Sequence, residues 1–155
     1  MIRILLTGGG TGGHVYPLLA VADALFGISK KPIEISYMGP KSVFDEEFLK
    51  REITVHHIFG AKLRRYADIQ NIIDIPKFLI SLLQTFWKLY FLMPDVVFSK
   101  GGSGALAVIL AARFYRIPVI VHDSDAVPGL TTRFSSVFAK RIGISFTEAG
   151  KYFPQ

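Results

Sequence analysis

The chain has 155 residues, of which 50% are hydrophobic and 19% are charged, a length and composition that fit one α/β domain with a sizeable core. It contains no cysteine, which excludes a disulfide framework and a thiolate metal site. The formal net charge of +6 favours nucleic acid, a phosphate-bearing ligand or an anionic membrane surface as the partner.

Neither a signal peptide nor a membrane-spanning helix is expected from the apolar residues. The apolar N-terminal stretch is short and runs directly into glycines, so it lacks the three-part layout of a signal peptide. The most apolar region spans 69–93, but its longest uncharged run is only 78–87. A spanning helix takes about 20 apolar residues, which argues against a transmembrane segment.

Short apolar runs alternate with helical patterns along the chain. Strands are expected at 3–6, 33–38, 54–59, 96–99, 119–121 and 141–145. Helices are expected at 15–26, 43–51, 74–93, 105–115 and 130–138, and another begins within 147–152. This alternation predicts an α/β fold with a Rossmann-like parallel β-sheet and helices on both faces, in a single domain over 1–155. Ligands of such sheets bind beyond the carboxyl ends of the strands.

The long helix is expected to begin near Asp74, a candidate N-cap with Pro76 just inside the first turn. A rotation of about 100° per residue places one apolar stripe against the core. Its members are Ile75, Phe78, Leu79, Leu82, Phe86, Leu89, Tyr90 and Met93. The far side holds Lys77, Ser81, Gln84 and Lys88.

A second apolar stripe on this helix makes the apolar arc wider than one buried face needs. It consists of Ile80, Leu83, Trp87 and Phe91. The stripe is covered by loops, docked on a partner chain, or placed on a membrane, where tryptophan beside lysine is a typical interfacial pairing. The membrane reading includes Lys77 and Lys88, and the basic loop residues Lys62, Arg64 and Arg65 would meet anionic headgroups.

A glycine-rich loop spans 8–13, between the first strand and the first helix. Glycines let a ligand approach the backbone, and the helix start suits a phosphate. The loop also satisfies the dinucleotide pattern G-x-G-x-x-G, but Met38-Gly39-Pro40 stands where an NAD site needs an acid. An NAD-dependent oxidoreductase is therefore disfavoured. His14 follows the glycines, and the helix dipole there favours its neutral, proton-accepting form.

Two further polar segments follow the fourth and fifth expected strands. The first, 99–104, is a second glycine loop with Lys100 beside it; its plainer interpretation is a tight turn with close helix packing. The second is His122-Asp123-Ser124-Asp125, which is either a polar turn or a set of donors and acceptors that face a sugar. Either aspartate could act as a base, and a metal site is the weaker alternative.

Three segments together resemble the MurG family of N-acetylglucosaminyltransferases, in order and spacing. They are 9–17 (Gly-Gly-Thr-Gly-Gly-His-Val-Tyr-Pro), 98–102 (Phe-Ser-Lys-Gly-Gly) and 122–130 (His-Asp-Ser-Asp-Ala-Val-Pro-Gly-Leu). The stretch 144–149 is also similar to the end of that family's first domain. The resemblance implies the N-terminal half of a GT-B fold. The donor domain of the family would begin beyond Gln155, so the chain is a cut piece or a natural half.

The resemblance also implies roles for individual residues. His14 would be the catalytic base, with Asp123 and Asp125 left open as alternatives. Donor UDP-GlcNAc contacts would come from Thr11, Gly12, Gly13 and Asp125. The acceptor diphosphate would contact Gly10, Lys100, Gly101, Gly102, Ser103 and Gly104. His122, Asp123 and Ser124 would form a supporting polar cluster.

Two positions depart from the family pattern. Many members carry His-Glu-Gln-Asn at 122–125, and an aromatic residue usually stands where this chain has Ser103. The resemblance nevertheless implies transfer of GlcNAc from UDP-GlcNAc to undecaprenyl-linked lipid I, without cofactor, metal or nucleic acid, at the cytoplasmic side of the bacterial inner membrane. The alternative is a non-catalytic, membrane-anchoring subunit of a split glycosyltransferase.

Overall fold

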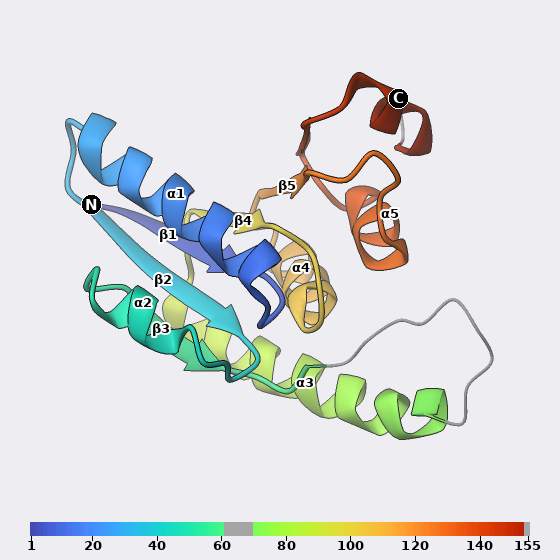
Figure 1. The fold of residues 1–155 in the computed structure, drawn as a ribbon. Coiled ribbons are helices and arrows are strands. Elements are labelled where there is room, and N and C mark those ends of the chain that lie inside the picture. Colours follow the sequence, from blue (N-terminus) through green and yellow to red (C-terminus); the bar gives the residue numbers. More distant parts are fainter. Residues whose placement is uncertain (61–69, 154–155) are drawn as a thin grey trace.

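Six parallel strands form one sheet in the order β3-β2-β1-β4-β5-β6 in the computed structural model, which describes residues 1–60 and 70–153 (Figure 1). The strands are β1 (Ile2–Thr7), β2 (Ile33–Gly39), β3 (Thr54–His57), β4 (Val96–Ser99), β5 (Val119–Asp123) and β6 (Arg141–Ile144). The helices are α1 (Gly12–Ile28), α2 (Asp45–Leu49), α3 (Gln70–Leu92), α4 (Ala105–Phe114) and α5 (Leu130–Ser136), followed by the 3₁₀ helix η1 (Thr147–Tyr152). The predicted fold class is confirmed.

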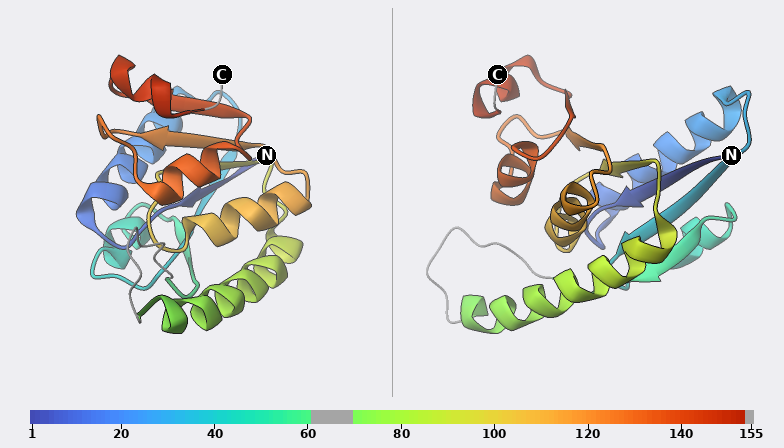
Figure 2. Two further views of the ribbon diagram at one scale, coloured as in Figure 1. Left: turned by 90° about the vertical axis from the view of Figure 1, so that its right-hand side faces the viewer. Right: turned by 180° about the vertical axis from the view of Figure 1, so that it is seen from behind.

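The core has two layers because side chains alternate across each strand. Leu5 of β1 belongs to the layer shared with α3 and α4, which includes Val97, Val108 and Leu89. Its neighbours Ile4 and Leu6 belong to the opposite layer with residues of α1 and α2. Figure 2 shows the sheet between these two groups of helices. The predicted helices on both faces are therefore present.

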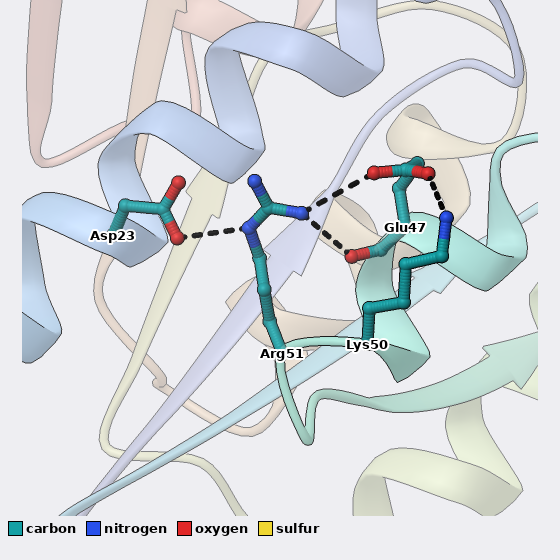
Figure 3. A network of polar contacts seen from close by, with 4 residues as sticks. All are labelled: Asp23, Glu47, Lys50 and Arg51. Carbon is teal, nitrogen blue, oxygen red and sulfur yellow. Dashed lines mark hydrogen bonds and ion pairs between the residues drawn. The ribbon is translucent and has the colours of Figure 1, made fainter.

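The short helix α2 is tied to α1 by a surface network of charged groups (Figure 3). The Arg51 guanidinium donates to Asp23 of α1 at 2.8 Å and to the carbonyl and carboxylate oxygens of Glu47 at 3.0 and 3.4 Å. Lys50 pairs with the same glutamate at 2.6 Å. Because these groups remain in contact with water, we read the network as orienting α2 rather than as a main source of stability.

The prediction for the start and the core face of α3 is partly wrong. The helix begins at Gln70 rather than near Asp74. Ser81 and Thr85 are fully buried with Leu89, whereas the expected core residues Ile75, Leu79, Tyr90 and Met93 are exposed. The reason is that α3 packs on α4, where alanines allow a close approach. The Thr85 hydroxyl is satisfied by donating to the Ser81 carbonyl at 2.7 Å, whereas the buried Ser81 hydroxyl has no hydrogen-bond partner among the described residues.

The second stripe on α3 is exposed as far as the described residues extend. Leu83, Trp87 and Phe91 are 65–70% exposed, and Ile80 is 47% exposed. Among the described helices, none is long and apolar enough to cross a membrane. Lys62, Arg64 and Arg65 lie outside the described residues.

The strand order reverses between β1 and β4, and this reversal marks one position at the carboxyl edge of the sheet. β1 and β4 are adjacent, with Thr7 level with Ser99, although the chain leaves them toward opposite sides of the sheet. In open α/β sheets, ligands bind where the strand order reverses in this way. Both glycine loops lie at this point.

Candidate functional site

The two glycine loops are joined to each other and to the sheet by backbone hydrogen bonds. Gly9 N donates to Gly101 O at 2.9 Å, and Lys100 N donates to Thr7 O at 2.9 Å. The Tyr37 hydroxyl donates to the carbonyl of Gly8 at 3.2 Å from the neighbouring strand. Burial raises the pKa of this phenol well above its ordinary value, so it remains a donor. The loops therefore form one rigid backbone surface.

Only glycine fits at position 102. Its φ is +89°, and a Cβ there would lie 2.7 Å from Gly9 N and 2.9 Å from His14 Nε2. A similar limit holds at Gly101, where φ is +78° and a Cβ would lie 2.6 Å from the Thr132 hydroxyl. These two glycines allow the second loop to lie against the first loop and against α5.

His14 lies in the first turn of α1, and its imidazole is held by Thr11. The Thr11 hydroxyl and His14 Nδ1 share a hydrogen bond of 2.7 Å. Thr11 is the N-cap residue of α1, yet its side chain caps no backbone N–H of the helix. Because the hydroxyl bonds to the imidazole instead, Thr11 orients the histidine rather than stabilising the helix end.

A hollow of about 380 Å³ opens beside His14 and gathers residues from all three predicted segments. It is lined by Gly13, His14, Lys100, Gly102, Asp123, Ser124 and Asp125, together with the first turn of α5, Gly129 to Thr132. The sequence interpretation did not include Thr131 and Thr132. The Pro128-Gly129 pair before them marks a helix start and was the available signal.

Two buried residues with ionisable side chains, Lys100 and Asp123, line this hollow. Lys100 is 6% exposed as a residue, and it makes no side-chain hydrogen bond or ion pair with any residue that the structure describes. Asp123 is 4% exposed and accepts a 2.7 Å hydrogen bond from Asp125 N, so one of its oxygens is already used to shape the turn. A lysine that lines the hollow without a side-chain partner among the described residues offers its ammonium to an anionic ligand.

His122 is not among the lining residues, although Lys100 and Asp123 are close enough to act on its charge. Its ring stacks on Phe98 with centroids 6.3 Å apart. Burial, and next the Lys100 ammonium, lower the pKa of His122 below its ordinary value, with Asp123 acting in the opposite direction. The side chain is therefore neutral at physiological pH and contributes no charge to the site.

Several residues that were expected at the site belong to the two glycine loops but do not line the hollow. Thr11, Gly10, Gly12, Gly101, Ser103 and Gly104 are not among its lining residues. Gly10 and Gly104 face the loop after β2 instead. Within residues 1–60 and 70–153, no group of three or more histidine, aspartate or glutamate side chains could hold a metal ion.

Comparison with known proteins gives a consistent result. Residues 4–144 match the glycosyltransferase family 28 N-terminal domain. The chain is 40% identical over 97% of its length to a Clostridium botulinum protein named UDP-N-acetylglucosamine--N-acetylmuramyl-(pentapeptide) pyrophosphoryl-undecaprenol N-acetylglucosamine transferase, and 41% identical to the Clostridium kluyveri protein of that name. It spans 41% and 42% of these two relatives.

Solved structures agree with the sequence relatives. Acinetobacter baumannii MurG superposes over 100% of this chain and 43% of its own, with a TM-score of 0.81 at 27% identity. A UDP-GlcNAc 2-epimerase from Methanocaldococcus jannaschii gives a TM-score of 0.69 at 13% identity, which shows a shared fold alone. The family match over most of the chain, supported by these relatives, places this chain in glycosyltransferase family 28 as its N-terminal domain.

Proposed function

We propose that this chain is the acceptor half of an inverting enzyme that transfers GlcNAc from UDP-GlcNAc to the C4 hydroxyl of MurNAc in undecaprenyl-diphospho-muramoylpentapeptide, lipid I. The names of its relatives supply the donor and the acceptor. The observation that carries the proposal is the hollow in which a buried lysine, Lys100, lines the same space as His14. It offers a cation for a diphosphate and a base for a hydroxyl.

The chemistry would be a single displacement at the anomeric carbon. His14 accepts the proton of the attacking C4 hydroxyl as the new C–O bond forms and the bond to UDP breaks. Thr11 keeps the imidazole in place through the 2.7 Å hydrogen bond. Lys100 and the glycine backbone at 101–104 hold the acceptor diphosphate, as charge-assisted and backbone donors do elsewhere. The residues implied here need no metal or cofactor.

Contacts to the donor would be shared with a second domain. Thr11, Gly12, Gly13 and Asp125 would meet UDP-GlcNAc from this side, and a donor domain of the kind that completes the relatives would supply the rest. Since this chain spans about two fifths of those relatives, we expect it to be insufficient for transfer alone.

The exposed face of α3 would place the enzyme at a membrane. Trp87 and Phe91 stack edge to face with ring centroids 5.3 Å apart, and Leu83 lies one turn earlier. Lys77 is exposed and Lys88 half-exposed on the same helix. An apolar strip flanked by cations suits the interface of an anionic leaflet. The location would be peripheral, at the cytoplasmic side of the bacterial inner membrane.

A transfer assay tests the whole proposal. This chain would be combined with a family 28 donor half, and transfer of labelled GlcNAc to a short-chain lipid I analogue would be measured. Product that depends on both halves is the expected result. If His14→Ala, Thr11→Ala and Gly13→Ala all leave transfer unchanged, the site assignment is wrong. If this half only recruits a donor chain that is already active alone, the non-catalytic anchoring alternative holds.

A further inference from the structure

The third residue of α5, Thr132, lines the hollow together with Lys100 and Gly102, although no sequence motif assigns it a role. The residue is 6% exposed. Arg133 N donates to the Gly129 carbonyl at 3.0 Å, which closes the first turn of the helix around the threonine. Because a side chain branched at Cβ has few rotamers in a helix, the position of the Thr132 hydroxyl is well defined.

The Thr132 hydroxyl lies against Gly101 of the second glycine loop. A Cβ placed on Gly101 would lie 2.6 Å from Thr132 Oγ1 and 3.8 Å from Thr132 Cβ. The hydroxyl is therefore the part of the threonine that is nearer to the loop. Gly101 does not line the hollow, whereas its neighbours Lys100 and Gly102 do. Thr132 thus stands beside Gly101 and completes the wall that these two neighbours form.

The backbone beside this hydroxyl already uses its N–H groups within the protein. Gly101 N donates to Ser99 Oγ at 3.1 Å, and the Gly101 carbonyl accepts from Gly9 N at 2.9 Å. The N–H of Lys100 is likewise used, in its bond to β1. A ligand at this part of the wall must therefore find its donors on side chains, and Lys100 and Thr132 both present one to the hollow.

The hydroxyl of Thr132 makes no hydrogen bond with any described residue, yet it is not sealed inside the protein. Ser135, about one turn later on α5, provides the contrast, because its hydroxyl is fully enclosed and has no partner among the described residues. The Thr132 oxygen is not among the enclosed atoms of this kind in residues 1–60 and 70–153, so it keeps contact with the space of the hollow. A largely buried side chain with an unused donor at a cavity suits a hydrogen-bond acceptor on a ligand.

We propose that Thr132 is a further binding residue for the acceptor, and that its hydroxyl donates a hydrogen bond to the diphosphate that Lys100 also holds. The inference rests on the proposed function, in which Lys100 and the second glycine loop bind the diphosphate of lipid I. The ammonium in the same hollow selects an anionic group, and a hydrogen bond to an ionised oxygen is about twice as strong as one between neutral groups. At Gly101 the hydroxyl supplies the donor that the backbone has already used.

The test uses the two-domain enzyme with this chain as its first half. Thr132→Val keeps the volume and removes the hydroxyl, whereas Thr132→Ser keeps the hydroxyl and removes the methyl group. Calorimetric titration with the short-chain lipid I analogue should show an affinity about tenfold to a hundredfold weaker for Thr132→Val, because a hydrogen bond to a charged group is lost. The affinity of Thr132→Ser should stay within about threefold of the wild-type value. Ser135→Ala is the matched control, since it removes an enclosed hydroxyl from the same helix, and it should leave the affinity unchanged.

A second ligand identifies the group that the hydroxyl contacts. In an analogue with a neutral linker in place of the diphosphate, the hydroxyl has no anionic partner, so Thr132→Val should bind this analogue as tightly as the wild-type enzyme does. Thr132→Ala also lacks the hydroxyl and should show the same pattern with the two analogues. An unchanged affinity of Thr132→Val for the lipid I analogue, an equal loss in Thr132→Ser, or equal losses with both analogues overturns the inference while the function stands. A wild-type enzyme without transfer overturns the proposed function, and the inference with it.

Discussion

The imidazole of His14 lies so close to Gly102 that a Cβ on residue 102 would fall 2.9 Å from Nε2. This contact joins the candidate base in the first glycine loop to the second loop, which comes from a different strand. It means that the position of the base depends on a glycine more than eighty residues away in sequence.

We expect Gly102→Ala to reduce both stability and transfer. The residue has φ of +89°, and its Cβ would also lie 2.7 Å from the backbone nitrogen of Gly9, so the loops must separate. Positive φ alone costs about 1–3 kcal/mol for a residue with a side chain. Chemical denaturation measures the loss of stability.

Gly13→Ala is the matched control for that substitution. A Cβ there meets nothing within 4 Å, and the residue is in the first turn of α1. Alanine should keep the stability or raise it by up to about 1 kcal/mol. Reduced transfer by a stable Gly13→Ala enzyme would show a ligand contact. Equal stability of the two variants would contradict the packing argument.

Thr11→Val should lower the turnover number without unfolding the domain. The valine keeps the volume but removes the 2.7 Å hydrogen bond to His14 Nδ1. Loss of a positioned base costs about 10²–10⁴ in rate, and His14→Ala should reach that range while Thr11→Val falls short of it. Steady-state kinetics of the two variants and of the double variant provide the test. Additive losses would mean that the two residues act independently.

Lys100→Met should weaken diphosphate binding while the fold stays intact. The lysine makes no side-chain hydrogen bond or ion pair with the described residues, so removal of its charge breaks no contact within the domain. Loss of a charge-assisted bond, about 1.5–3 kcal/mol, predicts at least a tenfold weaker acceptor affinity. Calorimetric titration with the lipid I analogue and a thermal melt measure the two effects. A lower melting temperature with unchanged affinity would make Lys100 a structural residue.

Trp87→Ser combined with Phe91→Ser should reduce binding to vesicles that contain anionic lipid. Both side chains are more than 60% exposed, so the fold should tolerate the change. Loss of two exposed aromatic groups predicts at least about a tenfold decrease in partitioning. Sedimentation with vesicles measures it, and Leu49→Ser, at an exposed position on α2, is the control. The same loss in the control would show nonspecific adhesion.

Stability should fall as the pH decreases below about 6.5. Burial, then the Lys88 and His57 charges, lower the pKa of His56, and burial lowers that of His122. The unfolded chain therefore binds these protons at a higher pH than the folded chain, so acid favours unfolding. Urea midpoints between pH 7.5 and 5.5 should show this slope. The pH dependence of the urea midpoint should be smaller in the double variant His56→Gln, His122→Gln. An unchanged pH dependence would exclude these histidines as its source.

The parts of the fold that follow local rules could be predicted from the sequence. Glycines after two apolar runs marked the carboxyl ends of β1 and β4. Because parallel strands end at the same edge of a sheet, the two glycine loops could be expected to lie together. Packing between distant elements could not be predicted in this way. Ser81 and Thr85 are buried because α4 presents small residues to them, which the periodicity of α3 alone cannot reveal. The loop at 40–44 lacks a motif, so its contact with Gly10 depends on strand order.

The bond from Gly9 N to Gly101 O also has a consequence for how the protein folds. Its two ends are separated by α1, β2, α2, β3, α3 and β4, so the glycine surface cannot exist until β4 has docked beside β1. Closing such a long segment slows folding. On the ribosome the glycine surface would thus form only after about two thirds of this chain had emerged, and nascent chains cut before Gly101 would lack it.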